Sequence, residues 1–405
     1  MDEPQDEPQD PFGGMIPGLG REGLPTDLPE NLADAPLFRE LQRVLLSGSG
    51  PVNWELARQI AVASAAADDQ PAAQDEGGMF EQVVRVAELQ VAAYTGFEPP
   101  SQVADVRAVG RAGWIQANAE GLRPLIEPAA ARLGEAVAAA QRAALPEGAP
   151  EFAGQLMSQL SPLLLGAQVG SVLGYLAQHV LGQYDVALPR PENAAMLFVV
   201  PNIAAFERDW SLDAREFRTW VALHEVTHRF EFTRPWTLPH LRGLLDDFLS
   251  TLRIDVEGLR ARLDSLDPAD PEGMRQMLEG EEGLFGTVLD DEQRIKLGRI
   301  QAFISAAEGY ADHVTHAIGR KLLGSYPRIE EAMRRYREGE HGDPVFERLL
   351  GIEMKREQYA AGRRFCDAVV EATDEHVLAR IWDSPEAVPS LPEIAEPSLW
   401  LARTV

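Results

Sequence analysis

The chain has 405 residues, of which 45% are apolar, so it is long and apolar enough to bury a large hydrophobic core. It carries 64 acidic and 37 basic residues, for a formal net charge of -27. Such a charge repels phosphate backbones and anionic lipid head groups, so we expect neither nucleic acid nor a membrane surface as a partner.

The N-terminal part of the chain contains a polar tail and then a helical region. Residues 1–33 are rich in Pro, Gly and Asp without periodic apolar positions, and we expect a disordered acidic tail there. The tail begins Met-Asp-Glu-Pro and lacks the basic and apolar regions of a signal peptide, so we expect a cytoplasmic location. Residues 34–150 form a predicted N-terminal helical region. Its helices are expected at Trp54–Ala66 with Asn53 as N-cap, Phe80–Tyr94, Gln102–Ala119 and Leu122–Ala144.

A long uncharged segment follows a Pro- and Gly-containing break at 145–150. The segment Phe152–Tyr184 contains no Asp, Glu, Lys or Arg, which raises the question of membrane insertion. Glutamines and Pro162 interrupt it, and this composition favours a buried helix over a membrane span. Gly166, Gly170 and Gly174 are four residues apart, a spacing that lets another helix approach closely.

We expect the region 151–405 to carry the functional site and to pack with the N-terminal region as one compact unit. After the uncharged segment, its residue pattern changes. Short β-branched or aromatic runs predict strands at Tyr184–Leu188 and Met196–Val200. An amphipathic helix is expected from about Asp213 to Phe232, ended by Pro235 and Pro239. Further helices are expected at Leu241–Leu263, Asp291–Leu323, Ile329–Glu338 and Pro344–Glu371, and irregular structure at Ser384–Val405. The predicted fold is mainly α, with a small β element before the helix at 213–232.

That helix contains the sequence His224-Glu225-Val226-Thr227-His228. Histidines at positions i and i+4 lie on one helix face, so both imidazoles can reach a single cation. With 8 histidines in the chain, chance predicts on the order of 0.02 such motifs. The spacing therefore indicates a zinc site. The lone cysteine, Cys366, cannot form an internal disulfide, and we assign it no role.

A catalytic zinc needs three protein ligands and an open position, so a further ligand must come from elsewhere. The predicted helix at 291–323 contains Glu308-Gly-Tyr-Ala-Asp312, with both carboxylates on one face. Glu308 is our candidate ligand and Asp312 a candidate partner for a ligand histidine. Gly309 is explained equally well by close helix packing. The alternatives to Glu308 are His313, His316, His240 and Glu231.

These residues together predict hydrolysis. Zinc lowers the pKa of a bound water, and Glu225 is placed to accept its proton as the general base. The oxyanion formed on a carbonyl also needs a stabiliser. The candidates for it are Tyr310, His240, His316 and Arg234, and the sequence does not choose among them.

The motifs resemble those of known metallopeptidases. The Glu-x-x-x-Asp spacing at 308–312 resembles the third-ligand helix of gluzincins, whereas Arg229-Phe-Glu-Phe follows the histidine motif where metzincins have Gly and a third His. Nearly end to end, the chain resembles the zincin-like metallopeptidase type 2 family, often labelled as associated with biosynthesis of the deazaflavin coenzyme. The segments that carry this resemblance are Gly50–Ile60, Leu181–Asp185, Leu197–Asn202, His224–His228, Glu308–Asp312 and Ile381–Pro389.

The resemblance implies a helix-rich, hydrolase-like fold in which His224, His228 and Glu308 bind metal and Glu225 is catalytic. It does not imply the substrate, for which a peptide or another small amide is our expectation. It does not indicate an oligomeric state either. The alternative is a non-catalytic zinc-binding or partner protein associated with a coenzyme biosynthetic pathway. Retention of Glu225 favours catalysis, because a structural metal site needs no general base.

Overall fold

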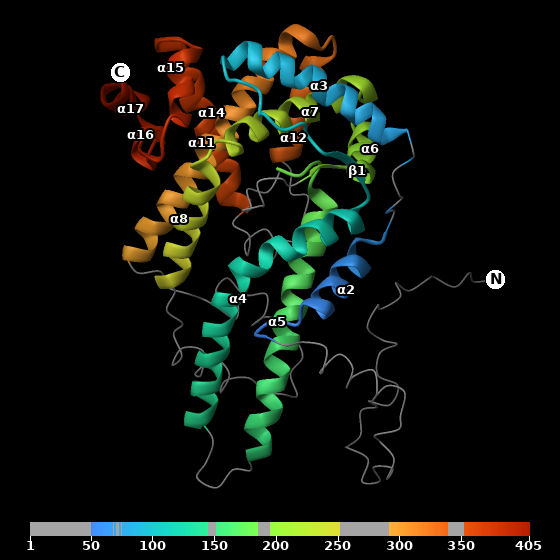
Figure 1. Cartoon of the computed structure of the whole chain (residues 1–405), viewed down its shortest axis with the longest axis vertical. Helices are drawn as coiled ribbons and strands as arrows, with labels where there is room; N and C mark the ends of the chain where they lie inside the picture. The colour runs from blue at the N-terminus through green and yellow to red at the C-terminus, as the bar shows by residue number, and fades with distance from the viewer. Residues whose placement is uncertain are drawn as a thin grey trace, which may run out of the picture. The chain divides into compact units, whose positions relative to one another are not determined.

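The structure is a computed structural model, and it describes residues 50–67, 69, 73, 75–144, 151–184, 195–251, 291–338 and 352–405. All of these residues belong to one compact unit, Ser47–Val405. Helices dominate the described ranges, and the named strands within them form one two-stranded parallel sheet (Figure 1). The predicted mainly α class is therefore confirmed. The acidic tail at 1–33 lies outside the described residues, and the division of the chain at residue 150 stays a prediction.

The elements follow one another along the chain with the labels of Figure 1. The first half contains α2 (Trp54–Ala65), α3 (Glu76–Thr95), β1 (Val106–Val109), α4 (Arg111–Ala144), α5 (Glu151–His179), β2 (Met196–Val199) and α6 (Val200–Asp209). The second half contains α7 (Ala214–Phe232), α8 (Thr237–Thr251), α11 (Asp291–Leu322), α12 (Tyr326–Glu338), α14 (Ile352–Ala372), α15 (Glu375–Ala379), α16 (Leu391–Ala395) and α17 (Pro397–Thr404).

Local side-chain caps set the start of two predicted helices. Asn53 Oδ1 accepts a hydrogen bond from the Leu56 amide at 2.9 Å, and α2 begins directly after it. Asp213 Oδ1 accepts one from the Glu216 amide at 2.9 Å at the start of α7. Short polar side chains satisfy amides that the first helical turn leaves unpaired. Both starts are confirmed as predicted. Helix α7 ends at Phe232, as expected, three residues before Pro235.

The prediction of a helix at Gln102–Ala119 is wrong in its first half. Residues Val106–Val109 form β1, which pairs in parallel with β2. Helix α4 then begins at Arg111, because the distant Asp69 accepts hydrogen bonds from the amides of Arg111 at 2.6 Å and Ala112 at 3.1 Å. Pairing with a strand some ninety residues away outweighs the local helical periodicity.

Helix α4 also joins the two helices that we predicted separately. It contains Pro124 and Pro128 and changes direction along its length (Figure 1), as expected for prolines inside a helix. The predicted strand at Met196–Val200 is present but ends at Val199, because Val200 begins α6. Tyr184 lies in a bend, and the rest of the strand predicted at 184–188 is outside the described residues.

The uncharged segment forms α5, which packs along α2 and α4. A Cβ atom added to Gly170 would lie 2.5 Å from the Ala57 carbonyl oxygen, and one added to Gly166 2.5 Å from that of Asn53. The glycines therefore permit a helix approach that no side chain allows. In the described part of the chain, no helix combines the length and apolar character needed to cross a membrane.

Strand β2 lies between two hydrophobic clusters. Met196 and Phe198 point into a large cluster formed by α3, α7, α11 and the C-terminal helices. Leu197 and Val199 point into a smaller cluster formed by α2, α4 and α5. All four side chains are buried, and successive residues of a strand face opposite sides. The strand is therefore a wall shared by both clusters.

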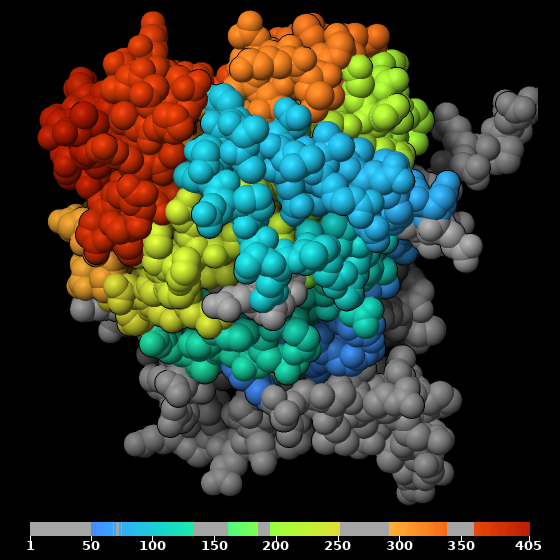
Figure 2. All heavy atoms as spheres, turned by 45° about the horizontal axis from the view of Figure 1, so that its top comes forward, coloured from blue at the N-terminus to red at the C-terminus, as the bar shows by residue number. Residues whose placement is uncertain are grey.

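The C-terminal segment is more regular than we predicted. Residues 384–405 contain α16 and α17 rather than irregular structure. Ser390 and Glu393 form a capping box at the start of α16, and the buried Trp400 donates from its indole to the Ala387 carbonyl at 2.8 Å. Figure 2 shows the C-terminal residues, in red, gathered at one side of the molecule beside the light-blue α3.

Replacing Gly170 by Ala should destabilise the fold, because the added methyl group meets the backbone of α2. The expected loss is about 1–3 kcal/mol, as for other overpacked sites. Gly243 on α8 provides a matched control, since a Cβ there meets nothing within 4 Å. Gly243→Ala should be neutral or stabilising by up to about 1 kcal/mol. Urea unfolding of the two variants tests the packing, and equal stabilities would contradict it.

Candidate metal centre

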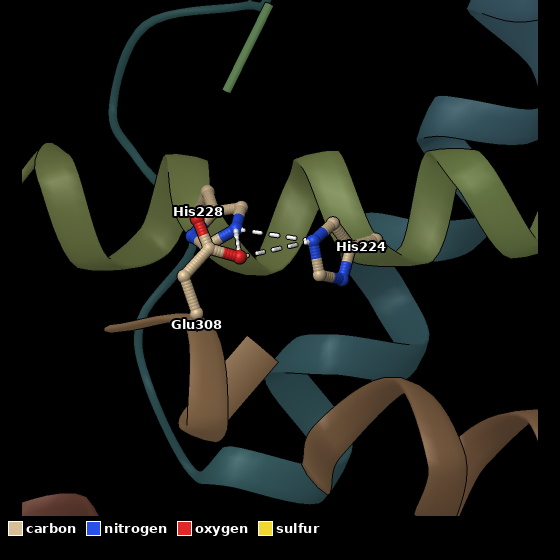
Figure 3. Close-up of side chains that lie close together, drawn as sticks. All are labelled: His224, His228 and Glu308. Atoms are coloured by element: carbon tan, nitrogen blue, oxygen red, sulfur yellow. Dashed lines mark hydrogen bonds and ion pairs between the residues drawn. The ribbon is translucent and has the colours of Figure 1, made fainter. Parts of the chain in front are cut away.

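Helix α7 brings two imidazoles to one point. His224 and His228 are one helical turn apart on the face that meets α11, and their Nε2 atoms are 3.3 Å apart (Figure 3). His224 is 6% exposed and His228 1% exposed, within a helix that is buried almost continuously from Phe217 to Phe232. The two nitrogens are thus fixed by the helix and shielded from water.

Helix α11 supplies a carboxylate to the same point. Glu308 Oε2 lies 3.7 Å from His224 Nε2 and 3.6 Å from His228 Nε2 (Figure 3). The close approach of α11 to α14 depends on Gly309, where a Cβ would lie 2.2 Å from the Gly362 carbonyl carbon. The packing explanation for Gly309 is therefore supported.

The three donor atoms fit a metal ion. His224, His228 and Glu308 form a buried group that could hold one. Their separations of 3.3–3.7 Å are close to the roughly 3.3 Å expected between tetrahedral ligands bonded at about 2.0–2.1 Å. The second carboxylate oxygen, Oε1 of Glu308, is buried without a hydrogen-bond partner among the described residues. Two imidazoles and one carboxylate are also the ligand types that zinc prefers.

The charges of this cluster attract a cation. Burial lowers the pKa of His228, but the carboxylates of Glu231 and Glu308 outweigh it and raise that pKa well above its usual value. Burial raises the pKa of Glu308, but His228 and His224 hold it below its usual value. Convergence of buried lone pairs is costly, and a bound cation or a proton shared among them offsets that cost.

Each imidazole has a carboxylate on its outer side. His228 Nδ1 is 2.8 Å from Oε2 of the fully buried Glu231, which fixes the ring through a hydrogen bond. His224 Nδ1 is 3.8 Å from Asp312 Oδ1. Arg337 on α12 binds both oxygens of Asp312, with Nη2 2.8 Å from Oδ1. Glu231, considered from the sequence as an alternative ligand, thus contacts a histidine nitrogen that faces away from the cluster.

Glu225 is held by the segment that precedes β2. Its Oε2 accepts a hydrogen bond from the Tyr184 amide at 2.8 Å, and the side chain is fully buried. A Cβ added to Gly182 would lie 2.3 Å from Glu225 Cδ, so the carboxylate lies directly on the backbone of this segment. Gly182 also forms an antiparallel bridge with Phe198 of β2. The sheet therefore positions the carboxylate of Glu225.

The remaining candidates lie outside the three-residue cluster. Tyr310 is buried against Trp382, with ring centroids 5.8 Å apart. His240 contacts Phe303, and burial lowers its pKa. His316 Nδ1 lies 2.9 Å from the Tyr326 hydroxyl and 2.7 Å from a Glu330 oxygen.

Two further residues have other surroundings. His313 lies between Tyr94, 2.9 Å from its Nε2, and Asp367, 2.6 Å from its Nδ1. Cys366 is fully buried, and burial raises its pKa well above the usual value. Neither takes part in the metal group, so the geometry favours Glu308 over the alternative ligands on α11.

Gly182, Tyr184 and Arg337 had no predicted role in the site, although the first two lie in the segment Leu181–Asp185 that carries the family resemblance. Only a conformation-dependent contact links them to the site, so residue type and spacing carried no signal for them. Glu231 did carry a signal, because it follows His228 by three residues and lies on a neighbouring position of the same helix face.

A His-Glu-x-x-His helix completed by a carboxylate from a second helix defines the zincin class of metal site. A family model described as zincin-like metallopeptidase matches residues 52–401. The chain belongs to this family. It is also similar to a protein of Chloroflexus aurantiacus, whose crystal structure is described as that of a "putative hydrolase with a novel fold". The two are 31% identical over 87% of this chain and 98% of the other, with a TM-score of 0.61. No curated protein matches the chain.

Removing Arg337 should destabilise the metal-free protein, because Asp312, only 8% exposed, loses its cation. Breaking a fully buried pair costs about 3–5 kcal/mol. Arg337 is 34% exposed, so solvent reduces the expected cost of Arg337→Met to about 2 kcal/mol. Adding Asp312→Asn should restore part of the loss. A double-mutant cycle in urea with chelator present measures this coupling, and additive effects would show that the pair contributes little.

Proposed function

We propose that this chain is a zinc-dependent hydrolase that cleaves peptides or other small amides. The observation that carries the proposal is the convergence of His224 Nε2, His228 Nε2 and Glu308 Oε2 within 3.7 Å of one another in a buried site. Membership of the zincin-like metallopeptidase family and the hydrolase similarity support the same class of reaction. The proposed ligands are His224, His228 and Glu308.

When bound, zinc supplies an activated water and polarises a carbonyl group. The protein's own side chains then divide the remaining work. Glu225 accepts a proton, and its anchorage to the Tyr184 amide leaves the carboxylate in one orientation. Glu231 orients His228 through its hydrogen bond. Asp312, 3.8 Å from His224 Nδ1, which has no hydrogen-bond partner among the described residues, is the proposed partner of that ring. Tyr310, His240 and His316 stay as proposed stabilisers of the oxyanion, and we do not rank them.

The second proposal is a non-catalytic zinc-binding or partner protein of a coenzyme biosynthetic pathway. The buried position of the whole site favours it, since His228 is 1% exposed and Glu225 fully buried. The fixed carboxylate of Glu225 favours the hydrolase, because a structural zinc site needs no base. We propose in either case a cytoplasmic protein. Its net charge of -27 argues against a nucleic-acid or membrane partner.

The purified protein should hold about one zinc per chain, and His228→Ala should abolish binding because it removes one of three ligands. Glu308→Ala should weaken zinc binding more than Asp312→Asn, since loss of an orienting contact costs about 10–100-fold. Elemental analysis and competitive chelator titration give both results. Unchanged zinc affinity in all three variants would exclude this site.

Glu225→Gln should keep zinc and fold while abolishing hydrolysis, because the amide is nearly isosteric but cannot accept a proton. Gly182→Ala should lower turnover as well, since its methyl group displaces the Glu225 carboxylate. Screening a peptide library with the zinc-loaded wild type identifies a substrate, on which both variants are compared. Wild-type turnover by Glu225→Gln would rule out the general-base role. Absence of turnover by the wild type would favour the binding protein.

A further inference from the structure

Arg234 lies just beyond the end of α7 and has an unusual environment for an arginine. Its guanidinium carbon is 4.0 Å from the centre of the Phe97 ring. Its Nε is buried without a hydrogen-bond partner, and the side chain makes no ion pair or side-chain hydrogen bond with any described residue. Burial lowers its pKa, against the weaker opposing effects of Tyr310 and Asp383. The side chain is half-buried.

The surroundings of Arg234 are aromatic and contain further unpaired donors. Phe97 stacks with Tyr310 at 6.2 Å between ring centres, and Tyr310 contacts Trp382 edge to face at 5.8 Å. Trp382 Nε1 and Thr237 Oγ1 are both buried without a hydrogen-bond partner among the described residues. Thr237 is joined to Arg234 by a backbone hydrogen bond of 3.1 Å. An arginine that stacks on an aromatic ring and has no carboxylate partner among the described residues is suited to an anion.

The energetics favour an anionic ligand over an empty site. The chain has 64 acidic residues, so most arginines can find a carboxylate partner. A partly desolvated guanidinium without such a partner in the described structure is therefore unexpected. Buried polar groups are ordinarily hydrogen-bonded, and those that are not commonly mark a ligand or water position. A guanidinium binds a carboxylate through two parallel hydrogen bonds, and its planar face remains free to stack on Phe97.

This arginine lies close to the metal centre along the chain. The Arg234 amide is hydrogen-bonded to the carbonyl of Glu231, whose side chain contacts His228. Arg234 follows His228 by six residues, which corresponds to about 9 Å at the helical rise of 1.5 Å per residue. An extended peptide covers this distance in about three residues.

We propose that Arg234 binds a free carboxylate of the substrate, and that the enzyme therefore prefers peptides or acyl amino acids with a free C-terminus. The position of the cleaved bond in this inference rests on the proposed hydrolase function. The binding of the carboxylate by Arg234 does not depend on it. The guanidinium recognises the anion, and Phe97, half-buried above the buried Tyr310 and Trp382, holds the guanidinium by stacking. The same chemistry recognises a side-chain carboxylate, so the test compares the two sources.

The test measures equilibrium binding to the zinc-loaded Glu225→Gln protein, which keeps the ligand intact. The probes are N-benzoyl-glycyl-phenylalanine, its C-terminal amide, and N-benzoyl-glycyl-glutamate α-amide, in which only the side-chain carboxylate is free. The acid should bind about 10–100-fold more tightly than its amide, the range for a hydrogen bond to a charged group. Arg234→Gln should remove this preference, and Arg234→Lys should keep part of it because the charge remains.

Arg242→Gln on the neighbouring α8 is the matched control, since it removes an exposed arginine of the same helical hairpin. It should retain the full preference. Thermal unfolding and zinc content establish that each variant is folded and loaded. If N-benzoyl-glycyl-glutamate α-amide binds more tightly than N-benzoyl-glycyl-phenylalanine, the ligand of Arg234 is an acidic side chain and not a C-terminal carboxylate.

Equal affinity of acid and amide for the parent protein, or the same preference in Arg234→Gln, would overturn the proposal. Failure of the wild type to hydrolyse any peptide is a separate result. If it accompanies an Arg234-dependent preference for the acid, the carboxylate site stands and only the proposed hydrolase is refuted.

Discussion

Convergence of three buried lone pairs is the constraint on which this structure depends. Two imidazole nitrogens and a carboxylate oxygen lie within 3.7 Å of one another, shielded from water, an arrangement that a positive charge at its centre stabilises. Keeping it requires two helices from distant parts of the chain to stay in contact. The buried face of α7, the glycine contact between α11 and α14 and the outer carboxylates all serve that requirement.

How much the sequence could predict depends on the range of the interactions involved. The two histidines are placed by one turn of helix, and Asn53 and Asp213 cap their helices through residues three positions away. All of this was predictable. Glu308 could be selected only because its helix was recognisable and its carboxylate spacing was distinctive. The amide that holds Glu225 comes from a segment about forty residues earlier, and no local pattern indicates it.

The errors in the fold have the same origin. The region before α4 is helical by periodicity, yet a parallel partner at Met196–Val199 converts four of its residues into a strand. Asp69 then fixes the start of α4 from more than forty residues away. The C-terminal helices are short, and their formation depends on burial of Trp400 and on the capping of α16 rather than on a long amphipathic repeat. Tertiary contacts decided these elements, and a single sequence contains little trace of them.

The position of β2 between the two hydrophobic clusters has a consequence for cooperativity. Because adjacent residues of one short strand are buried in different clusters, displacing the strand uncovers apolar groups of both clusters at once. The same strand bridges to Gly182, on whose backbone the Glu225 carboxylate lies. Partial unfolding of the α2–α4–α5 side would therefore reach the candidate metal centre. A metal ion bound on one side of the strand would stabilise helices on the other side that it never touches.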